Sequence, residues 1–168
     1  MLPEPLHPVI VHFPVVLALL LPIFAGGALW AIRRGARPLR AWAIPVALAA
    51  ALTLSSWVAV ETGEAAEDRV ERVVPHAAMD AHEDAAELFL ALSGVLAVVM
   101  AAGLTRGVAG RTARIAATAG TLALVVLAFR VGHSGGQLVY RYGAASAYTD
   151  SSVAPVADSR ASGEDDDR

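Results

Sequence analysis

The sequence contains no cysteine and no lysine, and charged residues make up only 17% of its 168 residues. The lack of cysteine excludes disulfide bonds, thiolate metal sites and covalent attachment of c-type haem. A soluble domain has about 25% charged residues, so the low charge content and the 56% apolar residues argue against a soluble protein. The arginines lie in short clusters between apolar runs, and we expect no nucleic-acid partner.

Four long apolar runs dominate the chain. Because about 20 helical residues cross the hydrocarbon core of a bilayer, each run predicts a membrane-spanning helix. The first run lacks a positively charged leader and is too long for a signal peptide, so it is interpreted as a retained helix. The sequence therefore predicts an all-α, integral membrane four-helix bundle in residues 1–143, with spans at about 9–32, 42–60, 85–104 and 115–131.

The arginines predict the orientation of these helices. Residues 33–40 read RRGARPLR, and residues 105–114 read TRGVAGRTAR. Short arginine-rich loops stay in the cytoplasm. We therefore expect a multi-pass protein of the bacterial inner membrane with both termini on the outer side. The remaining residues, 144–168, are rich in serine, alanine and aspartate and predict a disordered acidic tail.

All five histidines fall on the predicted outer side. His7 and His12 begin the first span, His76 and His82 precede the third, and His133 follows the fourth. Outer loops are simply where polar residues can lie, but a random distribution would place histidines on both sides. This one-sided grouping indicates a candidate site at the outer ends of the helices.

Three of these histidines come from different helices near one membrane boundary. His12 lies about one turn inside its helix, where a polar side chain needs a partner. His82 lies at a helix start, where the dipole favours a neutral imidazole, the form that binds metal ions. We predict that His12, His82 and His133 converge on one site that binds haem b or a transition-metal ion, with His7 as an additional ligand or gate.

Polar residues beside the histidines extend this site. Glu61 directly follows an apolar run and is predicted to be a metal ligand or a partner of a liganding histidine. Arg130 is expected to pair with Glu61 or with a haem propionate. Gly135 and Gly136 are expected to end the fourth helix, so that the following QLVYRYG segment lies along the outer face. The two helical hairpins are similar in length, but their sequences show no convincing internal repeat.

Four motifs give the chain a resemblance to a known family. LHPVIVHFPVVLALL, ETGEAAE, HEDAAE and GHSGGQLVYRYG resemble a bacterial membrane family catalogued as domain of unknown function 2231, over about residues 5–143. The resemblance implies a four-helix membrane domain and, because relatives occur beside Rieske or cytochrome c domains, a redox context. It marks the following residues: His7, His12, Glu61, Gly63, His82, His133, Gly135, Gly136 and Tyr140.

Two functions follow from these patterns. The first is a module that binds haem b or a metal ion for electron transfer, whose redox partner is a separate protein on the outer side because the chain has no cysteine. The second is a non-catalytic membrane module whose polar cluster is a structural or partner-docking network. A third reading is an enzyme with its own turnover. Membrane lipid is a partner in each case.

Overall fold

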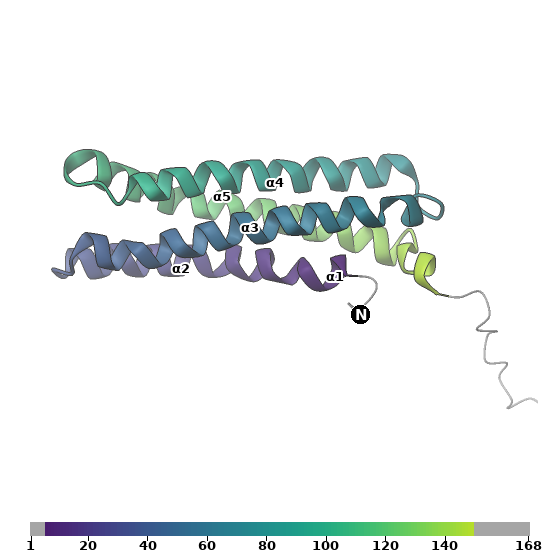
Figure 1. Ribbon diagram of the computed structural model, residues 1–168, viewed down its shortest axis with the longest axis horizontal. Helices are drawn as coiled ribbons and strands as arrows, with labels where there is room; N and C mark the ends of the chain where they lie inside the picture. Colours follow the sequence, from purple (N-terminus) through teal and green to yellow (C-terminus); the bar gives the residue numbers. More distant parts are fainter. Residues whose placement is uncertain (1–5, 150–168) are drawn as a thin grey trace, which may run out of the picture.

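The chain folds into long antiparallel helices that lie side by side along one axis (Figure 1). The computed structural model describes residues 6–149. These form, in chain order, α1 (His7–Ile10), α2 (His12–Arg33), α3 (Pro38–Val70), α4 (His76–Ala102), α5 (Gly107–Tyr140) and the 3-10 helix η1 (Ala144–Tyr148). Four helical stretches, with α1 and α2 counted as one, are long and apolar enough to cross a membrane. The predicted all-α fold with four such helices is therefore confirmed.

The four long helices form a ring in which each one contacts two others. Helix α2 packs against α3 and α5, and α4 packs against the same two helices. Within residues 6–149, α2 does not contact α4 and α3 does not contact α5. Helices α2 and α4 therefore occupy diagonal corners of the bundle, and side chains from both can meet on its central axis.

The two ends of the bundle differ in chemistry. We call the end formed by α1, the α3–α4 loop and the last turns of α5 the histidine end, and the end formed by the α2–α3 and α4–α5 loops the arginine end (Figure 1). The described chain begins and finishes at the histidine end. The membrane side that each end faces stays a prediction.

Alanine is the commonest buried apolar residue of the bundle, and many large apolar residues lie on its outside. Ala18, Ala25 and Ala117 are fully buried, whereas the Phe129 side chain is 75% exposed. Small side chains let membrane helices approach closely. An apolar exterior around a small-residue core suits helices that are surrounded by lipid and not by water.

A buried tryptophan connects the two helical hairpins, α2–α3 and α4–α5, at the arginine end. Trp42 on α3 is completely buried, and its indole N–H donates to the backbone carbonyl of Met100 on α4 over 2.9 Å. Gly103 gives the indole room, because a Cβ at that position would collide with the Trp42 ring nitrogen. One hydrogen bond and one close contact therefore fix the relative height of α3 and α4.

Replacing Trp42 by phenylalanine is expected to lower the free energy of unfolding by about 1–3 kcal/mol, because the hydrogen bond is lost and the smaller ring leaves a void. Unfolding of detergent-solubilised protein in denaturant measures this loss. The control is Trp30→Phe, since Trp30 is 62% exposed. Equal losses in the two variants would contradict the role given to Trp42.

One proline and two glycines bear on where the helices break and end. The first helical stretch is interrupted at Val11, because Pro14 has no N–H to donate to the carbonyl one turn earlier. The expected end of the fourth helix at Gly135 and Gly136 is wrong, since α5 continues to Tyr140. The residue that turns the chain is Gly143, with φ of +74°.

Local packing explains why α5 continues through its two glycines. Leu138 is buried against Val74 of the α3–α4 loop and Ala144 of η1. This contact outweighs the helix cost of about 1 kcal/mol for each glycine. Residues 138–140, expected to lie outside the helix, therefore form its last turn, and the predicted disordered tail starts with the ordered η1. The rest of that tail, residues 150–168, lies outside the described residues.

Candidate functional site

His7 is anchored on α3 by its Nδ1 atom. Helix α1 packs against α3, and Nδ1 of the half-buried imidazole lies 2.9 Å from the carbonyl oxygen of Ala59 and 3.4 Å from the hydroxyl oxygen of Thr62. A carbonyl oxygen only accepts hydrogen bonds. Nδ1 of His7 therefore carries the hydrogen, and the neutral ring keeps an unprotonated Nε2.

His82 is anchored on α5 in the same way. Its Nδ1 lies 2.9 Å from the hydroxyl oxygen of Ser134, and that hydroxyl donates its own hydrogen to the carbonyl of Val131 over 3.0 Å. A hydroxyl group has a single hydrogen. Because Ser134 has already donated it, His82 Nδ1 is the donor to Ser134, and this neutral ring also keeps its Nε2 lone pair.

The two imidazoles meet between the hairpins. Their ring centroids are 6.5 Å apart and their planes are nearly perpendicular, at 88°. His7 precedes α2 and His82 lies on α4, the helices at diagonal corners of the bundle. The pair therefore joins opposite corners at the histidine end.

A glycine next to each hydroxyl residue makes room for the imidazole. A Cβ at Gly63 would lie 3.2 Å from Cε1 of His7, and a Cβ at Gly135 would lie 3.0 Å from Cε1 of His82. Both separations are shorter than ordinary van der Waals contact. Each histidine thus packs on a helix surface that only glycine leaves open.

The two half-sites repeat one pattern. In each hairpin, a histidine of the first helix contacts a hydroxyl residue of the second helix, and glycine follows that residue: Thr62–Gly63 in α3 and Ser134–Gly135 in α5. Each hydroxyl oxygen also lies 3.0 Å from the carbonyl oxygen three residues earlier, although the Thr62 hydroxyl is slightly closer to the Val58 carbonyl, at 2.9 Å. This similarity is confined to a few residues, and the sequences of the two hairpins as a whole show no convincing repeat.

The expected convergence of His12, His82 and His133 is not found. Residues 6–149 contain no group of three or more histidine, aspartate or glutamate side chains placed to hold a metal ion. His12 is exposed. His133 is also exposed, stacks on Phe129 with centroids 6.2 Å apart and has its Nε2 3.1 Å from the Gln137 amide nitrogen. Of the predicted histidines, the structure brings together His82 and His7.

Two further predicted members of the site lie at its outside. Glu61 and Arg130 are both exposed. Within the described part of the chain they form no ion pair with each other, so the expected Glu61–Arg130 pair is wrong.

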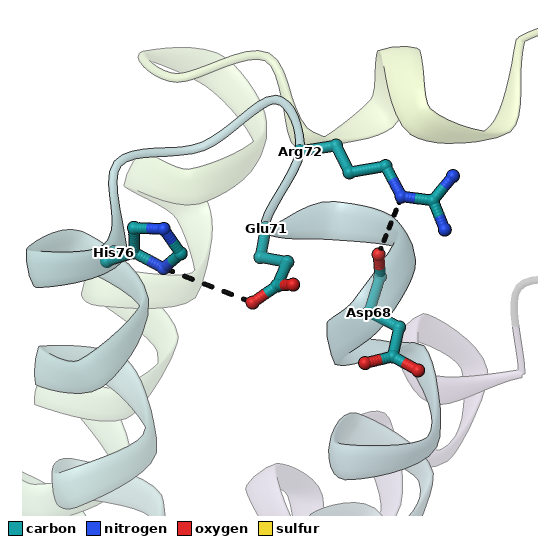
Figure 2. A network of polar contacts seen from close by, with 4 residues as sticks. All are labelled: Asp68, Glu71, Arg72 and His76. Atoms are coloured by element: carbon teal, nitrogen blue, oxygen red, sulfur yellow. Dashed lines mark hydrogen bonds and ion pairs between the residues drawn. The ribbon is translucent and has the colours of Figure 1, made fainter.

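His76 is the first residue of α4 and does not belong to the imidazole pair. Figure 2 shows its ring facing Glu71, with 4.0 Å between Nδ1 and a carboxylate oxygen, while Arg72 folds back on the Asp68 carbonyl. The His76 side chain is 76% exposed. It therefore serves as a control residue for the site.

Comparison with known proteins supports the resemblance seen in the motifs. The sequence model of a family described as "Predicted membrane protein (DUF2231)" matches residues 3–147. The chain belongs to this family. No curated protein and no solved structure matches the chain.

The DUF2231 match covers every residue of the imidazole pair and its anchors, and it agrees with the four membrane-spanning helices of the fold. Sequence reasoning missed the anchors Ala59, Thr62 and Ser134. A signal was present, since a hydroxyl–glycine dipeptide stands near the end of each hairpin, in ETGE and in HSGG. This multi-pass membrane protein therefore carries two matching histidine anchors.

Proposed function

We propose that this DUF2231 protein is an electron-transfer module of the bacterial inner membrane that holds haem b or a transition-metal ion between His7 and His82. The observation that carries the proposal is that the two imidazole rings have the same hydrogen bonding and protonation. Each Nδ1–H is held by a protein oxygen, at 2.9 Å in both cases. Histidines that bind metal ions are oriented in this way, with the second nitrogen left as the ligand.

The number and spacing of the rings favour haem b. Two histidines can hold a haem iron, whereas a zinc ion usually takes four ligands. The two rings come from opposed helices and their centroids are 6.5 Å apart, so both would be near a group bound at this end of the bundle. A b-type haem needs no cysteine, and the chain has none.

The surroundings suit a redox role at the outer face. If the arginine end lies in the cytoplasm, the histidine end faces outward, where a separate redox protein can approach. Arg130, exposed near this end, would then be available to a haem propionate. Glu61 would act as an exposed charge beside the site and not as a ligand.

An absorption spectrum of detergent-purified protein, oxidised and then reduced with dithionite, tests this function together with metal analysis. A Soret band that shifts on reduction supports haem b. A stoichiometric metal ion without a Soret band supports the bare-ion version. Neither signal, from protein expressed with haem precursor and metal supplied, would contradict the proposal.

One observation favours a second function. The two rings already contact each other edge to face, and each is hydrogen-bonded to the neighbouring hairpin helix. The pair could therefore lock the four helices together without any bound group. In that case neither the absorption spectrum nor the metal analysis would show a bound group, and removal of either ring would lower the stability of the bundle.

A further inference from the structure

A cavity of about 540 Å³ opens at the arginine end, away from the imidazole pair. It lies between the α2–α3 and α4–α5 loops, so both hairpins contribute to its wall. Four of its lining residues are arginines: Arg37, Arg40, Arg106 and Arg114. Neither the family match nor the proposed function assigns a role to this cavity.

Within residues 6–149, no carboxylate lines this cavity. The acidic residues of this part of the chain all lie in residues 61–87, a stretch that includes the α3–α4 loop at the opposite end of the bundle. Within residues 6–149, Arg37, Arg40 and Arg106 form no ion pair. The cavity is therefore lined by positive charge alone.

Arg114 shows that membrane topology is not the whole explanation. An arginine that only marks the cytoplasmic side has no need to be buried, whereas Arg114 lies on α5 and is 7% exposed. Its guanidinium group donates to the backbone carbonyl of Gly103. A buried charge is costly without a counter-charge, and one carbonyl does not supply it.

The backbone also contributes to the positive electrostatic potential of the cavity. Helices α3 and α5 begin at Pro38 and Gly107, and both residues line the cavity. The N-terminus of a helix carries a partial positive charge and unpaired N–H groups that favour anions. Two helix starts and a buried arginine therefore face one space.

We propose that this cavity binds a phosphate group. Arginine matches phosphate oxygens with paired N–H donors, and basic pockets at the ends of membrane helices suit anionic lipid headgroups. Because the cavity lies at the end of membrane-spanning helices, a lipid phosphate is within reach. A soluble phosphate has the same chemistry, and the experiment separates the two sources.

The test measures the thermal unfolding midpoint of the full chain in neutral detergent with added phosphatidylglycerol, phosphatidylcholine or inorganic phosphate at matched ionic strength. Phosphatidylglycerol is expected to raise the midpoint of the unchanged protein by about 5 °C at saturation, because a ligand that binds only the folded state stabilises it. Phosphatidylcholine is expected to have less than half that effect.

Matched variants locate the binding. The double variant Arg40→Gln/Arg106→Gln removes two lining charges and is expected to lose at least half of the shift. Arg111→Gln removes a charge from the same end without touching the cavity lining, and it is expected to keep the full shift. Arg114→Gln is also informative if it folds, and the double variant decides the test if it does not.

The outcomes separate clearly. A shift from phosphatidylglycerol alone that depends on Arg40 and Arg106 supports a lipid headgroup site. The same dependence with inorganic phosphate supports the site with a soluble ligand. Equal shifts in the double variant and in Arg111→Gln would reduce the effect to general surface charge and overturn the proposal, as would the lack of any shift.

Discussion

Replacing either His7 or His82 by alanine is expected to remove the bound haem or metal ion from the purified protein, with occupancy falling at least about tenfold. Each ring supplies one of two protein ligands, and a centre that loses one of two axial positions is held far more weakly. The measurement is the Soret absorbance or the metal content per chain. The two losses should be similar because the two half-sites repeat one pattern.

Three further histidines serve as controls for that experiment. His12, His76 and His133 are exposed, so their alanine variants are expected to keep the bound group. The sequence alone predicted that changes at His12 and His133 would abolish binding, and this series decides between the two expectations. Equal loss in all five variants would indicate general unfolding and contradict the assignment to His7 and His82.

The membrane helices could be predicted from the sequence because apolar runs report directly on lipid contact. The ends of these helices could not be predicted from the sequence. The last turn of α5 is held by the burial of Leu138 against Ala144 and against Val74, which is far away in the sequence. A glycine pair would end an isolated helix. In this protein the pair lies inside α5, because tertiary contacts extend the helix beyond it.

The end of the bundle that carries the site could also be predicted, because polar residues collect where helices leave the lipid. Which rings point inward depends on helical phase. His12 follows His7 by five positions, which would turn their side chains about 140° apart on a regular helix, and the helix is interrupted between them at Val11. His133 directly precedes Ser134, so it points about 100° away from the residue that contacts His82. The spacing gives these relative angles, but it does not show which ring of each pair faces inward.

The site needs small residues as much as histidines. In the α5 sequence HSGG, Ser134 accepts from His82 and Gly135 lies against its ring. The next residue, Gly136, has no atom within 4 Å of the position where a Cβ would stand. Two adjacent glycines in the same helix thus have different surroundings, and they form a matched pair for substitution.

Gly135→Ala is expected to lower the affinity of the site for its haem or metal ion by about 10–100-fold, the usual cost of disturbing the partner that orients a liganding histidine. The new methyl group would lie 3.0 Å from Cε1 of His82, so the ring must move, and its hydrogen bond to Ser134 lengthens. Gly136→Ala meets nothing and is expected to keep full affinity while stabilising the helix by about 0.5–1 kcal/mol. Titration of the emptied protein with haem or metal, followed by absorbance, measures the affinities, and unfolding in denaturant measures the stabilities. Gly63→Ala, whose methyl group would lie 3.2 Å from Cε1 of His7, should reproduce the Gly135→Ala defect in the other hairpin. If Gly135→Ala and Gly136→Ala bound equally well, the contact between glycine and imidazole would have no part in positioning the ligand.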